Sequence, residues 1–171
     1  MKLHRSMTAG FVFLILISGF MAAESTVFAK NSSAPKAAGE GKAKSGEARL
    51  SLTTKGDEYV FDKTKLTAKA GQKVQVTFKN SSNPSSALEH NWVLVKPGTA
   101  DKVANEGIQA GADKGWIPVG SPDILASTKL IKAGQSETVT FTAPSEPGDY
   151  PYLCTFPGHA TMMKGILTVT K

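Results

Sequence analysis

Cysteine is almost absent from this sequence, which contains Cys154 alone among 171 residues. A single cysteine cannot form a disulfide within the chain, so no disulfide framework stabilises the fold. Cys154 could pair with another chain, bind a metal, act as a nucleophile or lie buried in a core. The residues around Cys154 indicate which of these roles applies.

The sequence also lacks a concentrated block of basic residues. The formal net charge is +6, yet residues 49–171 carry 14 Lys/Arg against 11 Asp/Glu, and no basic run interleaves with aromatic residues. A nucleic-acid-binding surface would show such interleaving, so we exclude nucleic acid as a partner. The length and the ordinary composition indicate one soluble domain.

The first 29 residues have the pattern of an export signal. Lys2 and Arg5 precede an apolar run over 9–23, and Val27-Phe28-Ala29 offers a cleavage site before Lys30. The run is short for a membrane span of about 20 residues, so cleavage is favoured over an uncleaved anchor. We expect an exported protein, in the periplasm or at the outer face of the cytoplasmic membrane. An uncleaved signal would tether it to the membrane through the N-terminus.

Residues 30–48 are rich in Ala, Gly, Ser and Lys and contain no large aliphatic or aromatic side chain. Such a segment cannot bury enough surface to offset the entropy lost on ordering. We therefore interpret 30–48 as a flexible linker, and 49–171 as the folded domain.

Short strands dominate the pattern of this domain. Residues 73–79 and 137–142 alternate polar and apolar side chains with a period of two, as a half-buried strand does. Further strands are expected near 50–52, 60–61, 92–95, 150–152 and 166–169. The spacing predicts an all-β fold, an antiparallel β-sandwich of seven or eight strands. Trp92 and Trp116 are expected in its core.

One short helical insertion is predicted within Thr99–Ala112. Asp101 could cap the helix. The residues expected on one side of it are Val103, Ala104, Ile108 and Ala112.

Four side chains with metal-binding chemistry stand out. His159 follows Cys154 by five residues, Met163 follows His159 by four, and Pro157-Gly158 makes a turn between them. His90 lies far upstream, at the start of another expected strand. Two imidazoles and a thiolate with a weak axial thioether describe a blue-copper electron-transfer site. Met162 and Met163 are adjacent and should point to opposite faces, and the loop spacing favours Met163 as the ligand.

One loop of this sequence resembles the ligand loop of azurins and auracyanins in the cupredoxin family. It is the segment Cys154-Thr155-Phe156-Pro157-Gly158-His159, which Met163-Lys164-Gly165 follows. His90-Asn91-Trp92-Val93-Leu94 resembles their upstream ligand strand. The resemblance implies a Greek-key cupredoxin-like sandwich that binds one type 1 copper ion, cycling between Cu(I) and Cu(II). It implies His90, Cys154 and His159 as equatorial ligands and Met163 as the axial ligand.

The same resemblance implies two supporting roles and a set of partners. The Asn91 side chain would tie the two ligand loops together, and the Phe156 N–H would donate to the thiolate. The protein would shuttle single electrons between redox partners such as c-type cytochromes, a respiratory oxidase or a photosynthetic reaction centre. We expect no enzymatic activity.

The chain departs from azurins at two points. Azurins carry a structural disulfide, for which this sequence has no second cysteine. Azurins also have glycine before the first histidine ligand, where this chain has Glu89, which argues against a fifth weak ligand. Both the missing disulfide and the long N-terminal extension favour the auracyanin branch.

Two other functions fit part of the pattern. In a thiol enzyme, Cys154 would be a nucleophile with His159 as its base, but Met163 would then have no purpose. A copper store or carrier would use several exposed Met, Cys or His residues, whereas this chain has a single set. We expect His159 to be the shallower histidine, surrounded by an apolar patch of Phe156, Pro157, Gly158 and Met162.

Overall fold

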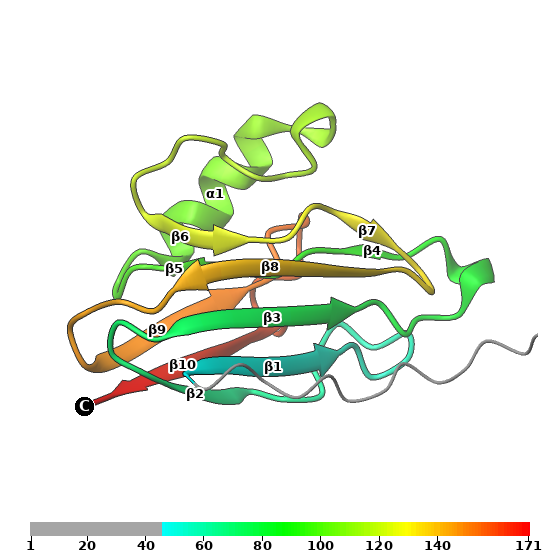
Figure 1. Ribbon diagram of the computed structural model, residues 1–171. Coiled ribbons are helices and arrows are strands. Elements are labelled where there is room, and N and C mark those ends of the chain that lie inside the picture. The colour runs from blue at the N-terminus through cyan, green and yellow to red at the C-terminus, as the bar shows by residue number, and fades with distance from the viewer. Residues whose placement is uncertain (1–45) are drawn as a thin grey trace, which may run out of the picture. The chain divides into compact units, whose positions relative to one another are not determined.

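The computed structural model describes residues 46–171, in which two β-sheets face one another (Figure 1). The first sheet lies at the front of Figure 1 and has the strand order β1-β3-β8. Its strands are β1 (Glu47–Thr53), β3 (Lys73–Lys79) and β8 (Ser136–Thr142).

The second sheet lies behind the first and has the order β2-β10-β9-β5-β6. Its strands are β2 (Lys65–Lys69), β10 (Lys164–Thr170), β9 (Gly148–Leu153), β5 (Val93–Val95) and β6 (Ile124–Ser127). A separate pair joins β4 (Glu89–His90) to β7 (Ile131–Lys132). Two single-turn 3-10 helices, η1 (Pro84–Ser86) and η2 (Ala112–Lys114), lie in the connections.

The core fills the space between the two sheets. Along β3 the side chains of Val74, Val76 and Phe78 are fully buried, while the polar residues between them face outward. The facing sheet contributes Leu94, Tyr152, Leu167 and others to the same cluster. Burial of each large apolar side chain stabilises the fold by about 1.5–3 kcal/mol, which explains why the period-two pattern sets the strand faces.

The β-sandwich predicted from the sequence is confirmed, but its sheets are mixed rather than antiparallel throughout. β1 pairs with β3 in parallel, and β10 pairs with β2 in parallel. A parallel pair needs a crossover connection, and here the chain passes through β2 of the opposite sheet between β1 and β3. The expected strand at 60–61 is wrong, since Phe61 forms only an isolated bridge with Thr54.

The folded domain begins slightly earlier than the sequence indicated. β1 starts at Glu47, within the segment interpreted as linker, and Glu47 and Ala48 pair with Lys73 and Val74. The Glu47 carboxylate also lies 3.7 Å from the Lys73 ammonium. These two residues carry no alternating apolar signal, which is why the pattern missed them. The export signal at 1–29 and the linker up to residue 45 lie outside the described residues.

The insertion is the helix α1 (Ala100–Ala110), which lies at the top of Figure 1 beside β6. Thr99 occupies the N-cap position, so the expected cap at Asp101 is wrong, although its negative charge in the first turn favours the helix dipole. Val103 and Gly107 are buried, whereas Ile108, which was expected on the same side of the helix as Val103, is 50% exposed. Gly107 takes the inner position because an added Cβ would lie 2.5 Å from the Trp116 carbonyl oxygen.

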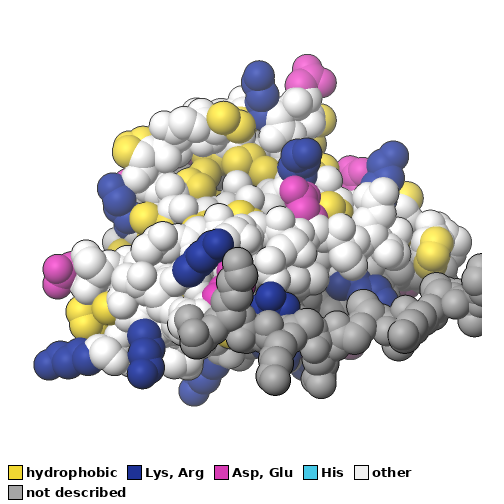
Figure 2. Space-filling model, in the orientation of Figure 1, with side chains coloured by type: hydrophobic (Ala, Val, Ile, Leu, Met, Phe, Trp, Pro, Cys, Tyr) yellow, Lys and Arg dark blue, Asp and Glu magenta, His cyan; other side chains and the backbone are white. Residues whose placement is uncertain are grey.

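Surface charge is dispersed over the described part of the chain. Lys/Arg and Asp/Glu side chains are interspersed on the face shown in Figure 2. Lys102 on α1 contacts both Glu106 and Asp123, which links the helix to the segment before β6. Within residues 46–171 there is no helix with the length and apolarity needed to span a membrane.

Gly165 on β10 provides a test of this packing. It lies opposite Tyr152 in the β9–β10 register, and an added Cβ would lie 2.3 Å from the end of the buried Tyr152 ring. That ring cannot move freely, because its hydroxyl donates to the Lys63 carbonyl at 2.7 Å. We expect Gly165→Ala to lower the free energy of unfolding by about 1–3 kcal/mol in urea titrations. The exposed neighbour Lys164 provides the control, because Lys164→Ala should change the free energy of unfolding by less than about 0.5 kcal/mol. Equal effects of the two changes would contradict this packing.

Candidate metal centre

The sandwich brings the four predicted ligand residues to one end of the sheets. His90 ends β4, and Cys154 directly follows β9. Met163 directly precedes β10, and the Cys154 N–H donates to the Met163 carbonyl at 3.0 Å. His159 lies in the turn between them, and its carbonyl accepts from the Met163 N–H at 2.8 Å. Strand pairing thus places both ends of the loop side by side.

Three of these side chains converge on a small buried volume. Cys154 Sγ lies 3.9 Å from His90 Nδ1 and 3.7 Å from His159 Nδ1. The ligand atoms of this trio all lie within 4.8 Å of one another, and all three residues are buried.

These spacings fit a metal ion with trigonal ligands. Bond lengths of about 2.3 Å to sulfur and about 2.0 Å to nitrogen, as in zinc sites, separate the two ligands by about 3.7 Å at a 120° angle. The His90 ring turns Nδ1 toward the sulfur, and its buried Nε2 has no hydrogen-bond partner among the described residues. Burial of an unpaired ring nitrogen costs free energy, and a metal bound at the other nitrogen, Nδ1, would contribute a favourable contact to the same ring.

Burial controls the protonation of the trio. Desolvation, with a smaller effect of nearby His159, lowers the pKa of His90 to about 4, and desolvation also lowers the pKa of His159. Both imidazoles are therefore neutral at pH 7, with a lone pair available for a metal. Burial raises the pKa of the Cys154 thiol to about 11, against the opposing effect of two backbone N–H donors. A metal must displace the thiol proton when it binds.

Hydrogen bonds around the sulfur match the supporting roles that the resemblance implied. The Asn91 side chain accepts from the Thr155 N–H at 2.8 Å and donates to the Thr155 hydroxyl at 2.9 Å. Asn91 thereby ties the two ligand loops together. The backbone N–H groups of Asn91 and Phe156 both donate to Cys154 Sγ.

The two adjacent methionines have opposite surroundings, as their adjacency predicted. Met163 is fully buried and belongs to the same core cluster as Cys154, whereas Met162 is 64% exposed. Burial in this cluster favours Met163 over Met162 as the residue that faces the centre.

An aromatic residue that sequence reasoning missed covers the centre. The Tyr59 ring stacks on the His159 imidazole, with ring centroids 4.4 Å apart and planes inclined by 22°. His159 is the shallower histidine, as expected, but it is only 5% exposed because of this cover. Tyr59 comes from the connection between β1 and β2, which carries no ligand motif, so no signal in the sequence pointed to it.

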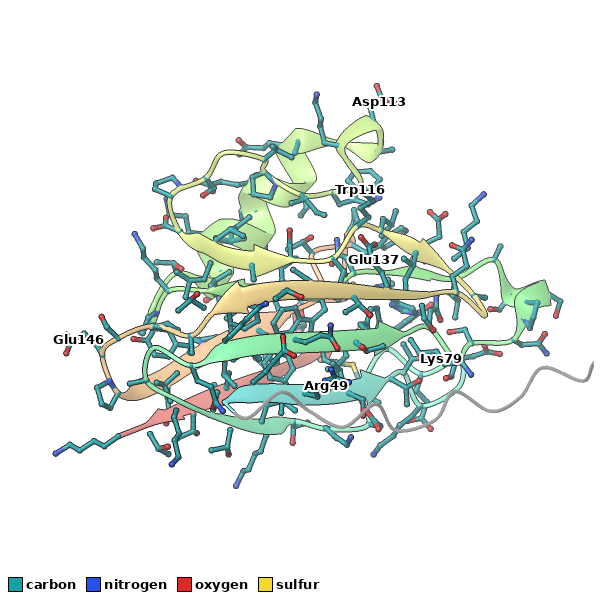
Figure 3. The ribbon with its side chains drawn as sticks, viewed as in Figure 1. Arg49, Lys79, Asp113, Trp116, Glu137 and Glu146 are labelled. Carbon is teal, nitrogen blue, oxygen red and sulfur yellow. The ribbon has the colours of Figure 1, made fainter. Side chains whose placement is uncertain are left out.

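Trp116 also lies near the ligand loop rather than in the core. It is half-buried, and its ring meets the edge of Phe156 at a centroid distance of 5.8 Å. Figure 3 shows Trp116 on the sheet side of the helical insertion, with Asp113 at the outer tip. Trp92, by contrast, is fully buried in the core as predicted.

Comparisons with known proteins agree with this chemistry. The family described as copper binding proteins, plastocyanin/azurin family, matches residues 48–170. Auracyanin-A of Chloroflexus aurantiacus is 42% identical over 127 residues, which are 73% of this chain and 76% of that protein. Azurin of Pseudomonas fluorescens biotype C is 38% identical over 117 residues, covering 66% of this chain and 91% of that protein.

A solved structure supports the same relationship. Dithionite-reduced auracyanin from the photosynthetic bacterium Roseiflexus castenholzii superposes with a TM-score of 0.67 and 41% identity, covering 72% of this chain and 98% of that chain. The family match over residues 48–170 includes the segments that carry His90, Cys154 and His159. The chain therefore belongs to the cupredoxin family of plastocyanin/azurin copper-binding proteins, auracyanin-like and azurin-like in sequence, and its His90–Cys154–His159 cluster fits one type 1 copper ion.

Proposed function

We propose that this protein carries one type 1 copper ion and passes single electrons through it outside the cytoplasm. His90 Nδ1, Cys154 Sγ and His159 Nδ1 would hold the ion, and the Met163 thioether would be its weak fourth ligand. The observation that carries the proposal is the buried trio, whose sulfur lies 3.7 and 3.9 Å from the two imidazole nitrogens. The copper supplies a one-electron couple between Cu(I) and Cu(II) when bound.

The chain contributes a ligand set of mixed character in a rigid frame. Thiolate and thioether favour Cu(I), and imidazole suits Cu(II), so the set serves both oxidation states. Backbone and side-chain hydrogen bonds hold Cys154, Asn91 and Met163 relative to one another. Little ligand movement is then needed when the charge of the centre changes, which favours fast electron transfer.

The burial of Cys154 argues against a thiol enzyme. Its side chain is completely buried, whereas a nucleophile needs an open approach for a substrate. A copper store is disfavoured for a related reason, because the His90–Cys154–His159 trio is enclosed rather than exposed for exchange. Electron transfer is the function that an enclosed, preformed centre serves best.

The proposal extends to export of the chain and to the classes of redox protein with which it would exchange electrons. Residues 1–29 would direct the chain to the periplasm or to the outer face of the cytoplasmic membrane, with cleavage before Lys30. Redox proteins such as c-type cytochromes, a respiratory oxidase or a photosynthetic reaction centre would be its partners. N-terminal sequencing of the exported protein tests the cleavage, and a first residue ahead of Lys30 would indicate a retained membrane tether.

We propose the surface beside His159 as the electron port. Met162 and Gly158 are exposed there, and Phe156 and Pro157 are partly exposed. An apolar rim allows transient docking without the desolvation cost of charged groups. His90 is completely buried, so the path through His159 is the shorter one.

The ligand assignment can be tested by colour. We expect Cys154→Ser to remove the blue thiolate-to-copper absorption after addition of Cu(II), because serine offers no thiolate. A visible spectrum of the purified variant provides the measurement. A blue Cys154→Ser protein would refute the assignment.

A matched methionine pair tests the axial position. We expect Met163→Leu to stay blue and to raise the reduction potential, since it removes a weak electron donor from the copper. Met162→Leu should leave the potential near that of the natural protein, because Met162 points to solvent. Voltammetry of both variants decides the point, and a large shift in Met162→Leu alone would assign the axial role to Met162.

The port can be tested with an added charge. Met162→Lys should slow electron self-exchange between two copies, because like charges would then meet at the contact. The effect should weaken at high salt, which screens exposed charges beyond about 10 Å at 0.1 M. NMR line broadening of mixed oxidation states measures the rate. Thr140→Lys, an equal charge on the outer face of β8, provides the control. Equal rates in the two variants at low salt would place the port elsewhere.

A further inference from the structure

Two aromatic rings from distant segments enclose the His159 imidazole. The Tyr59 ring stacks on it at 4.4 Å, and the Phe156 ring stacks on it at 4.6 Å with planes inclined by 29°. Two rings cannot both stack on one face of an imidazole at these separations, so they occupy opposite faces. Tyr59 itself is 43% exposed, which means that it lies between His159 and solvent.

Among the described residues, the Cys154 sulfur is the only polar partner that could fix the direction of the His159 ring. A histidine that binds a metal usually donates its second ring N–H to a protein acceptor, which fixes the ring orientation. Among residues 46–171 the only polar contact of the His159 ring is the one between Nδ1 and Cys154 Sγ. Stacking is therefore the contact that can keep Nδ1 turned toward the sulfur.

The backbone that carries Tyr59 is itself well anchored. The Lys55 N–H donates to the Val60 carbonyl at 3.2 Å and closes the turn that contains Tyr59. Directly after this turn, the buried Phe61 ring meets the rings of Phe78 and Tyr152 edge to face.

The other side of the turn is bonded to the segment that leads to His90. The Ser82 hydroxyl donates to the Gly56 carbonyl at 2.9 Å, and the Asn83 N–H donates to the Asp57 carboxylate at 2.7 Å. The segment that leads to His90 thus also supports the turn of Tyr59, and Tyr59 covers His159. Tyr59 has a fixed position from which to restrain His159.

We propose that Tyr59 is a positioning residue that clamps the His159 ring against Phe156 and closes the outer side of the metal centre. The role rests on the proposed function, since it concerns the readiness of His159 to bind copper. Without the clamp, the imidazole would turn outward part of the time, and Cys154 behind it would become accessible. Loss of one aromatic pair of this kind shifts such an equilibrium by about three- to tenfold.

The test compares the full-length natural protein with Tyr59→Leu and Tyr59→Phe. Leucine keeps an apolar side chain but removes the ring, whereas phenylalanine keeps the ring. The first measurement uses the metal-free proteins and follows the reaction of Cys154 with a small aromatic disulfide reagent. We expect the Tyr59→Leu thiol to react about three- to tenfold faster than the natural one, and the Tyr59→Phe thiol to react at the natural rate.

The second measurement uses the copper-loaded proteins and follows loss of the blue absorption to a chelator. Tyr59→Leu should lose copper faster by a similar factor, and Tyr59→Phe should not. Ile108→Leu changes another exposed apolar residue, on α1, and should match the natural protein in both measurements. Thermal unfolding of each variant verifies that Tyr59→Leu remains folded, as the exposure of Tyr59 leads us to expect.

Two outcomes would overturn the clamp. One is natural thiol reactivity and natural copper loss in folded Tyr59→Leu. The other is an equal change in Tyr59→Phe and Tyr59→Leu, which would assign the effect to the hydroxyl rather than to the ring. Failure of the proposed function looks different, because the natural protein would then not turn blue with Cu(II). The reaction of the metal-free thiol would still report on the clamp in that case.

Discussion

The Asn91 side chain joins the two loops on which the whole centre depends. It exchanges two hydrogen bonds with Thr155, one residue after Cys154, while its own backbone follows His90 and donates to the sulfur. The Asn91 amide also donates to the Gly115 carbonyl at 3.2 Å, and this third bond connects the helical insertion to the two loops. One buried amide thus connects three segments that are far apart in the sequence. Because buried polar groups are costly when unpaired, loss of any partner would disturb all three segments together.

Burial of the His90–Cys154–His159 trio places a cost on the fold that a bound metal would offset. His90 and Cys154 are completely buried, and desolvation shifts the pKa values of both toward their neutral forms. The metal-free protein therefore holds neutral groups, which a β-sandwich core tolerates. A bound cation would take the place of the thiol proton on Cys154, with the neutral imidazoles of His90 and His159 already facing the sulfur. The same buried core that raises the free energy of ionising these side chains also holds them in position for an ion.

Sequence reasoning predicted the centre best where the pattern was local. Cys154, His159 and Met163 share one short loop, so their spacing indicated the chemistry. His90 was predicted because that loop calls for a distant histidine at the start of another strand. Tyr59 could not be predicted this way, because its contact with His159 joins residues one hundred positions apart. The same holds for the parallel pairing of β1 with β3, since periodicity indicates strand faces but not strand partners. On α1 the buried residues are Val103 and Gly107, and the sequence could not indicate Gly107 because glycine carries no apolar signal.

The two histidines are held by different kinds of contact, and this asymmetry gives the centre an inner and an outer side. His90 belongs to β4, pairs with Ile131 of β7 and is completely buried. His159 lies in a turn and is restrained by rings, Tyr59 on one face and Phe156 on the other, with Trp116 at the edge of Phe156. Backbone pairing gives the inner ligand a rigid position. Aromatic stacking restrains the outer histidine while it leaves apolar, polarisable rings beside the surface that we propose as the electron port.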